Sequence, residues 1–202
     1  MKNRTGTRLA LTGMASALVL AWHPPARSAA ADGTGAAIAQ DAPPVGAATL
    51  RQVRRSMLLD LHGSAAEAFP LFGPVREAEW ATGWQPRFAA PFPPSQGADG
   101  AVFTTEGHGG ESVWVMTAYD SAAGRIAYVV VTPRLVTCEL EIHVSPAGDS
   151  ASRAEVTFRY TALEAEGNVY IEHWLGSFVG MAPHWEHALD ARLLALHPGP
   201  GR

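Results

Sequence analysis

The sequence is poor in the residues that most often carry reactive chemistry. Its 202 residues include one cysteine, Cys138, and one lysine, Lys2. A single cysteine forms no internal disulfide, so a hydrophobic core must hold the fold together. The apolar content of 47% is enough for such a core. With no lysine after residue 2, Schiff-base chemistry and a phosphate-loop lysine are both excluded from the folded domain.

The common catalytic and metal-binding motifs are missing as well. His108-Gly109-Gly110 superficially resembles an oxyanion loop, but the chain has no GxSxG elbow, which excludes a hydrolase of that kind. His184 and His187 have a spacing that can chelate a metal, yet HExxH is absent and no third ligand is evident, which favours a surface pair. We therefore predict no catalytic residue, no metal and no cofactor.

The N-terminus has the pattern of an export signal. Basic residues at positions 2, 4 and 8 precede the apolar run Leu9 to Trp22, which is too short to span a bilayer, and Ala29-Ala30-Ala31 offers a cleavage site. We predict a signal peptide over residues 1–31 and a periplasmic or secreted protein after cleavage near Ala31. An over-extended gene start and a membrane-anchored tail are the alternatives.

Positive charge is scarce in the rest of the chain. Without residues 1–31 the chain keeps 11 basic and 19 acidic residues, a net charge of −8 in place of −4. Such an acidic chain is a poor partner for nucleic acid or for anionic membrane surfaces. We expect no stable membrane insertion of the mature protein, and a monomer or weak dimer.

The remaining chain predicts one domain, with a flexible Ala/Gly/Pro linker at 32–49, the folded region at 50–197 and a disordered tail at 198–202. Ser64 with Glu67 predicts a capped short helix after the first strand, and Pro74 predicts a second one over Val75 to Trp80. Prolines at 91, 93 and 94 forbid a central strand there. Apolar runs separated by turn residues predict antiparallel strands at Met57–Leu61, Ala101–Glu106, Val113–Tyr119, Ile126–Val131, Val136–Val144 and Ala154–Leu163.

The last two predicted strands show which face of the sheet is buried. Apolar residues alternate with polar ones from Val136 to Val144, and again from Ala154 to Leu163, as in a sheet covered on one face. Phe158 and Tyr160 share the inward parity. The two middle strands are apolar on both parities, which leaves Trp114 and Tyr128 without a predicted orientation.

A long amphipathic helix follows the last strand after the acidic turn 164–168. Its apolar residues recur at steps of three and four, and Pro183 in its middle should kink or split it. The stripe comprises Ile171, Leu175, Phe178, Ala182, Trp185, Leu189, Leu193 and Leu196. The element order predicts an α+β helix-grip fold, a curved antiparallel sheet wrapped round one long C-terminal helix. One helix rarely fills the concave side of such a sheet, so a pocket is expected.

These features resemble the START/Bet v 1-like (SRPBCC) superfamily over about residues 53–196, and an uncharacterised bacterial branch of it in particular. The segments that carry the resemblance are Glu77-Ala78-Glu79-Trp80 with Gly83-Trp84, Tyr119-Asp120, and Tyr160-Thr161-Ala162-Leu163 with Glu166-Gly167-Asn168. The resemblance implies the helix-grip fold. Because the superfamily includes lipid and hormone carriers, cyclases, aromatases and oxygenase domains, it limits function only loosely.

The candidate ligand-cavity residues are mostly aromatic. Trp80 and Trp84, close to Phe88 and Phe92, either line the mouth of the cavity or fill the gap between the short helices and the sheet. Tyr160 is the most informative polar group, since a buried phenol needs a partner. The predicted set is Trp80, Trp84, Phe103, Trp114, Tyr128, Phe158, Tyr160, Phe178 and Trp185.

Other reactive side chains receive structural interpretations. Cys138, on the apolar parity of its strand, is expected to be an unreactive core or wall residue. Glu77 and Glu79 lie two residues apart and face different ways on a helix, so they are expected to be solvated acids, although one of them could point inward.

These observations favour an exported, non-enzymatic protein that binds a small hydrophobic molecule, a lipid or an aromatic compound, in an apolar cavity. The alternative is an enzyme of the polyketide cyclase, aromatase or dehydratase kind that uses the same cavity. Such enzymes rely on pocket shape and one or two polar side chains, and so leave little trace in sequence. A periplasmic interaction module, with an exposed apolar patch, is a third hypothesis.

Overall fold

The computed structural model describes residues 49–89, 99–107 and 109–197. The predicted signal peptide (1–31), the tail (198–202), the proline-rich run at 91–94, His108 and all but one residue of the predicted linker (32–49) lie outside these ranges.

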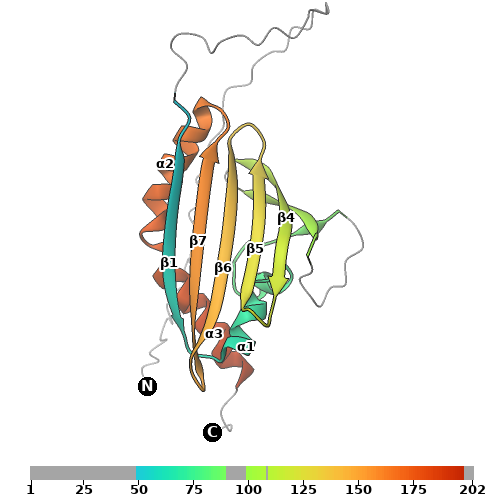
Figure 1. Ribbon diagram of the computed structural model, residues 1–202, viewed down its shortest axis with the longest axis vertical. Helices are drawn as coiled ribbons and strands as arrows, with labels where there is room; N and C mark the ends of the chain where they lie inside the picture. The colour runs from blue at the N-terminus through green and yellow to red at the C-terminus, as the bar shows by residue number, and fades with distance from the viewer. Residues whose placement is uncertain (1–48, 90–98, 108, 198–202) are drawn as a thin grey trace, which may run out of the picture.

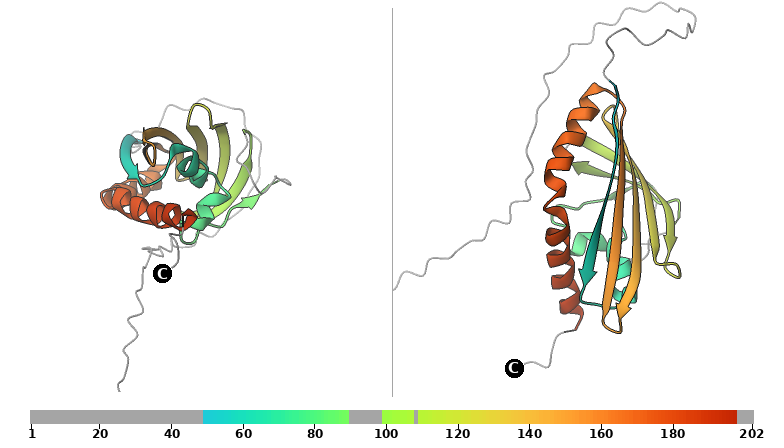
Figure 2. Two further views of the ribbon diagram at one scale, coloured as in Figure 1. Left: turned by 90° about the horizontal axis from the view of Figure 1, so that it is seen from below. Right: turned by 60° about the vertical axis from the view of Figure 1, so that its left-hand side comes forward.

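The described chain forms one curved antiparallel sheet with helices along its open side (Figures 1 and 2). The strand order is β1-β7-β6-β5-β4-β3-β2, so the last strand of the chain pairs with the first. The strands are β1 (Gln52–Leu61), β2 (Arg87–Phe88), β3 (Val102–Gly107), β4 (Gly110–Asp120), β5 (Arg125–Thr132), β6 (Val136–Gly148) and β7 (Ala151–Ala162). This arrangement confirms the predicted helix-grip fold and its meander of hairpins.

The concave face of the sheet is the apolar one, as the alternation in β6 and β7 predicted. Inward residues of both strands, Cys138 and Phe158 among them, are buried, whereas Glu139 and Arg159 between them face solvent and form an ion pair. The structure also orients the ambiguous middle strands. Trp114 of β4 and Tyr128 of β5 both turn inward, with their ring centroids 5.7 Å apart.

The segment after β1 forms three short turns of helix, one more than predicted: α1 (Ala65–Ala68), η1 (Phe69–Phe72) and η2 (Arg76–Glu79). The predicted capping box is present, because the Glu67 carboxylate accepts hydrogen bonds from the Ser64 backbone N–H at 2.9 Å and the Ser64 hydroxyl at 2.7 Å. η1 and η2 are 3₁₀ turns, and Pro70 lies in the first turn of η1. Proline cannot donate the backbone hydrogen bond that would continue α1.

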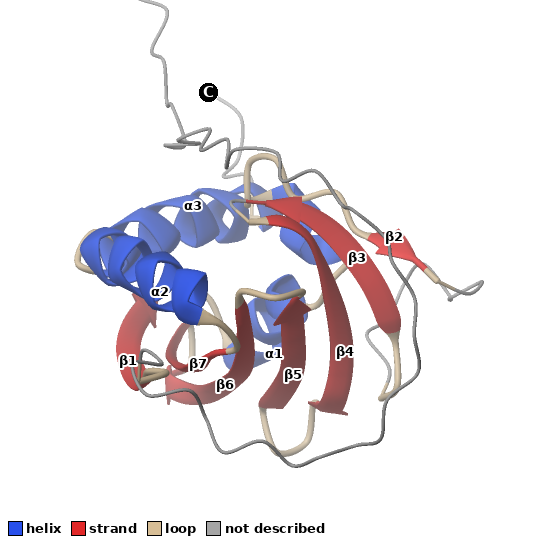
Figure 3. Cartoon of the chain, turned by 90° about the horizontal axis from the view of Figure 1, so that it is seen from above, coloured by secondary structure: helices blue, strands red, loops and turns tan. Residues whose placement is uncertain are grey.

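The C-terminal helix is divided into α2 (Ala165–Phe178) and α3 (Met181–Leu196), which lie along the concave side of the sheet (Figure 3). The split predicted from Pro183 is confirmed, but it lies before the proline, at Val179-Gly180. A proline ring clashes with the carbonyl four residues earlier, which here belongs to Val179. The acidic turn predicted at 164–168 is mostly the first turn of α2, with Glu164 as its N-cap.

The start of α2 is tied to the start of β1 by Asn168. Its side-chain oxygen accepts from the Arg51 N–H at 2.9 Å, and its amide group donates to the Thr49 carbonyl at 3.0 Å. Gly167 beside it packs so closely on the chain before β6 that an added Cβ would overlap the Leu135 carbonyl oxygen. The Gly-Asn pair at the helix start is therefore structural.

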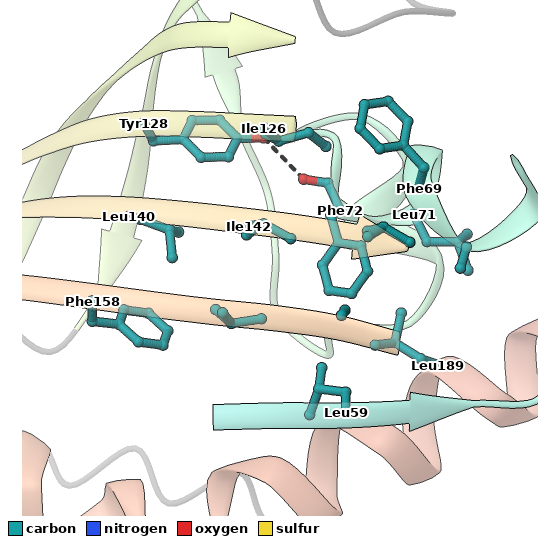
Figure 4. Packing of buried hydrophobic residues seen from close by; sticks show 14 of the residues in the cluster. Leu59, Phe69, Leu71, Phe72, Ile126, Tyr128, Leu140, Ile142, Phe158 and Leu189 are labelled. Carbon is teal, nitrogen blue, oxygen red and sulfur yellow. Dashed lines mark hydrogen bonds between the residues drawn. The ribbon is translucent and has the colours of Figure 1, made fainter. Parts of the chain in front are cut away.

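The main core lies between the sheet, α1 and η1, and α3 (Figure 4). Its fully buried side chains include Leu59, Phe72, Phe103, Ile126 and Leu189. A smaller cluster of Val136, Ala162 and Ile171 joins α2 to the sheet. Among the residues described, no helix is both long enough and apolar enough to cross a bilayer.

Candidate functional site

A small, partly open cavity of about 70 Å³ lies inside the grip, between α2 and strands β4 to β7. Most of its wall is apolar, and its polar groups come from serine, threonine, cysteine and tyrosine. The lining residues are Ser112, Trp114, Val130, Thr132, Val136, Cys138, Leu140, Phe158, Tyr160 and Tyr170. The cavity thus has the composition of a small-molecule site, an apolar wall with a few convergent polar atoms.

The polar groups form two hydrogen-bonded sets. The Tyr160 hydroxyl shares hydrogen bonds with the Cys138 thiol and the Tyr170 hydroxyl. The hydroxyls of Ser112 and Thr132 are 2.8 Å apart. Burial raises the pKa of Tyr160 well above its ordinary value and that of Cys138 to about 12. These groups are therefore neutral hydrogen-bonding partners near pH 7, and the thiol is not a nucleophile.

The turns beside the start of α2 pack closely on one another. A Cβ added at Gly109, in the turn between β3 and β4, would lie 2.8 Å from Leu135 Cδ1 and 3.2 Å from Tyr170 Cε2. This turn therefore rests directly on the β5–β6 turn and on the ring of Tyr170. At Gly109 the close atoms are ends of side chains, whereas at Gly167 the obstacle is the Leu135 backbone carbonyl, so only position 167 strictly requires glycine.

Three of the nine predicted cavity residues, Trp114, Phe158 and Tyr160, line this cavity. The half-buried Trp80 and Trp84 instead fill the gap between the short helices and the rest of the core. Their indole N–H groups donate to the carbonyls of Leu71 and Pro74, each at 2.7 Å, and so do not face the cavity.

The other four predicted residues pack around the cavity. Phe103 stacks on Trp114 with centroids 5.6 Å apart, and the Tyr128 hydroxyl donates to the Phe72 carbonyl at 2.9 Å (Figure 4). The rings of Phe178 and Trp185 both lie 6.3 Å from Phe158. Together these side chains form an aromatic layer that occupies much of the concave space.

Tyr170 and Trp174 are the aromatic residues of α2 that the sequence did not single out. Tyr170 lines the cavity, and the ring of Trp174 lies 4.6 Å from that of Tyr160. They neighbour the predicted apolar stripe and are four residues apart, as is Phe178 from Trp174. This spacing, a second aromatic row on one helix face, is the signal that could have identified them.

Glu77 and Glu79 have opposite environments on η2. Glu79 forms ion pairs with Arg76, at 2.9 Å, and with Arg192 of α3, and these hold its pKa at about 2. Glu77 has no such partner, and burial raises its pKa to about 8. Glu77 is thus the acid of the pair that points inward, the possibility left open for one of them, although its side chain keeps part of its accessible surface.

The sequence also singled out a histidine pair on the C-terminal helix. His184 and His187 lie exposed on α3. Within the ranges that the structure describes, no three side chains of the metal-ligating types come close enough together to hold an ion.

Comparison with known proteins identifies the fold. No protein-family model matches the chain, and a search of curated proteins finds no match. Norcoclaurine synthase from Thalictrum flavum, as a point mutant with a transition-state analogue, has a TM-score of 0.57 and 13% identity, over 75% of this chain and 99% of its own. A START superfamily protein from Mycobacterium smegmatis has a TM-score of 0.53 and 14% identity, over 71% and 98%. Ara h 8.0201 has a TM-score of 0.52 and 12% identity, over 72% and 99%.

The chain therefore has the helix-grip fold of the Bet v 1/START-like (SRPBCC) superfamily. At identities of 12–14%, these similarities show a shared fold and nothing beyond it.

Proposed function

We propose that the protein binds a small, mainly apolar molecule in the cavity between α2 and the sheet. The observation that carries this proposal is the separation of polar and apolar groups on the cavity wall. Tyr160, Tyr170 and Cys138 present polar atoms at one place, and apolar side chains supply most of the remaining surface. A ligand with an apolar body and one hydrogen-bonding group matches this wall, because each buried polar atom then keeps a partner.

The size of the cavity narrows the ligand class. At about 70 Å³ it is roughly half the size of cavities of ~150 Å³ that bind benzene, and far below the ~300 Å³ of sites for drug-sized ligands. A single-ring aromatic compound is much closer to this volume than a lipid chain, which needs a cavity several times larger. We therefore favour the aromatic ligand over the lipid.

The cavity chemistry supports binding over catalysis at this place. A cyclase or dehydratase needs a group that exchanges a proton near neutral pH. Burial raises the pKa values of Tyr160, Tyr170 and Cys138, so all three stay protonated there. They can orient a ligand by hydrogen bonding but cannot act as its base. The enzymatic alternative thus lacks a base among the cavity-lining residues.

Ligand binding is tested by filling the cavity. We expect the wild-type protein to bind phenol, measured by tryptophan fluorescence, because Trp114 lines the site. The double variant Val130→Leu/Val136→Leu adds two methylene groups to the cavity wall and should weaken binding at least ten-fold. Native mass spectrometry with extraction of the purified protein should also release a bound compound.

The control is Val129→Leu, the same Val→Leu substitution at one position of β5 that does not line the cavity. Its phenol affinity should equal that of the wild type. Equal affinities in the wild type and the filled variant, or no phenol binding by the wild type, would contradict the proposal.

We also propose that the binding domain acts outside the cytoplasm, on the basis of the basic and apolar pattern in residues 1–31. In a bacterial host, we expect the full-length chain to yield a periplasmic or secreted product whose N-terminus begins near residue 32. Intact-mass measurement of the fractionated protein checks this. A product that retains residues 1–31 in the cytoplasm would argue for the over-extended gene start.

A further inference from the structure

Ser112 and Thr132 form a second polar pair on the cavity wall, and the proposed function gives it no role. Their hydroxyl oxygens lie 2.8 Å apart, across strands β4 and β5, and both residues line the cavity. Thr132 is only 3% exposed, so its side chain is shielded from bulk water. We call these two residues the hydroxyl pair. Polar groups set into a mainly apolar wall are what orients a ligand in a small-molecule site.

The hydroxyl pair has one hydrogen atom more than its internal contact uses. Two hydroxyl groups carry two donor hydrogens, and the single bond between them takes one, whichever hydroxyl is the donor. In the part of the chain that the structure describes, neither side chain forms another hydrogen bond. The hydroxyl pair can therefore donate one hydrogen bond to a ligand.

Tyr160, Tyr170 and Cys138, which we call the tyrosine set, offer a donor in the same way. In their neutral forms these side chains carry three hydrogens, and they share two hydrogen bonds centred on the Tyr160 hydroxyl. One hydrogen is left for a ligand. The cavity thus presents two donors, and each suits an oxygen that accepts a hydrogen bond.

The strand register places the tyrosine set and the hydroxyl pair at opposite sides of the cavity floor. Cys138 of β6 lies opposite Val130 of β5, and Val136 lies opposite Thr132. Cys138 and Thr132 are therefore diagonal neighbours, which are roughly 7–8 Å apart in a sheet. Tyr160 of β7 lies beyond Cys138, on the side away from β5. The two valines occupy the other corners and provide an apolar floor.

We propose that the cavity selects a single aromatic ring that bears oxygen atoms on two opposite carbons, as in a 1,4-dihydroxybenzene. One oxygen accepts a hydrogen bond from the tyrosine set and the other accepts one from the hydroxyl pair, while the ring lies over Val130 and Val136. Oxygens on neighbouring carbons lie side by side and cannot reach both donors. This inference rests on the proposed function and deepens it, because it specifies the substitution pattern of the ligand.

The first test compares hydroquinone with p-cresol, which has a methyl group of similar size in place of the second hydroxyl. The wild type should bind hydroquinone about three- to ten-fold more tightly, the effect of one added hydrogen bond. Without a donor at that position the order should reverse, because the second hydroxyl would lose its water and gain nothing. Catechol, with its hydroxyls on neighbouring carbons, should bind at least about three-fold more weakly than hydroquinone. Isothermal titration calorimetry under nitrogen, which prevents oxidation of the diphenols, measures all three affinities.

Substitutions in the hydroxyl pair identify the donor. The double variant Ser112→Ala/Thr132→Val removes both hydroxyls with little change in size, so the preference for hydroquinone over p-cresol should disappear while p-cresol affinity does not fall. Each single variant keeps one hydroxyl hydrogen and should keep the preference. The matched control is Ser56→Ala/Thr157→Val. It removes another serine–threonine hydroxyl pair, 2.7 Å apart across β1 and β7, at positions that do not line the cavity, and the preference should remain.

The outcomes separate this inference from the proposed function. A wild type that binds p-cresol as tightly as hydroquinone, or more tightly, would overturn the inference and leave the apolar site of the proposed function standing. A wild type that binds neither compound would overturn both. The inference is also wrong if catechol binds as tightly as hydroquinone, or if the double variant Ser112→Ala/Thr132→Val keeps the preference.

Discussion

Replacing Glu77 with glutamine is expected to raise the free energy of unfolding by about 3 kcal/mol at pH 8.5 and to leave it nearly unchanged at pH 4. Burial raises the pKa of this carboxyl group from 4.5 to about 8 in the folded protein. Each pKa unit corresponds to about 1.4 kcal/mol of stability. Because the Glu77 side chain keeps some accessible surface, the effect on the free energy of unfolding is smaller than the full pKa shift implies. Glutamine has the same shape and never ionises.

The sign follows from proton binding in the two states. Between pH 4.5 and about 8 the folded protein holds the Glu77 proton and the unfolded chain has released it. The unfolded state binds fewer protons, so the contribution of this group to stability falls as pH rises through this window and is constant above it. The gain from Glu77→Gln should therefore grow from pH 4.5 to about pH 8. Urea unfolding at pH 4, 6 and 8.5 measures it.

Glu79→Gln is the matched control, because it makes the same change two residues away on η2. Hydrogen bonds and ion pairs with Arg76 and Arg192 lower the pKa of Glu79 to about 2. This substitution should cost about 1 kcal/mol at neutral pH, and the cost should shrink as pH falls below 4.5. A gain from Glu77→Gln that is the same at all three pH values would show that the Glu77 carboxyl group is not buried.

Replacing Phe103 with alanine is expected to lower the free energy of unfolding by about 3–5 kcal/mol, the usual cost of removing a fully buried phenyl ring. Phe103 is 0% exposed and contacts the rings of Trp84, Phe88, Trp114 and Tyr128. Its loss therefore leaves these rings without their common neighbour. Val102→Ala on the same strand is the control: Val102 is 38% exposed, and the change should cost less than about 1 kcal/mol.

Ligand binding provides a second test of the void that Phe103→Ala leaves. An apolar cavity of that size stays dry and binds benzene, and a ligand that binds only the folded state raises its stability. Benzene should therefore raise the melting temperature of Phe103→Ala by several degrees more than that of the wild type. A loss below about 1 kcal/mol, or equal benzene effects on both proteins, would mean that the aromatic layer repacks around the missing ring.

The sequence correctly predicted the parts of the fold that depend on local periodicity. The alternation around Cys138 and Tyr160 correctly placed both side chains on the concave face. The Ser64–Glu67 capping box formed as predicted, and Pro183 divided the helix. In each case the interacting residues lie within a few positions of one another or on one strand, so the local sequence pattern is enough to predict their arrangement.

The aromatic residues show what the local sequence pattern does not determine. The sequence left Trp80 and Trp84 as either cavity wall or packing, and the positions of the Leu71 and Pro74 carbonyls decide between the two. Trp114 and Tyr128 lie on strands that are apolar on both faces, so the curvature of the sheet gives them their direction. Tyr170 reaches the cavity only because Gly167 allows α2 to approach the β5–β6 turn.

By itself, then, the sequence determined the element order, the apolar face of the sheet and hence the helix-grip fold, because these depend on periodicity within single elements. The tertiary structure alone decided how much of the concave space remains open and which acid faces inward. Both depend on contacts between residues far apart in the chain, such as Glu79 with Arg192 and Phe103 with Tyr128. The environment of Glu77 differs from that of Glu79 because those long-range contacts orient η2, and the local sequence pattern does not predict such contacts.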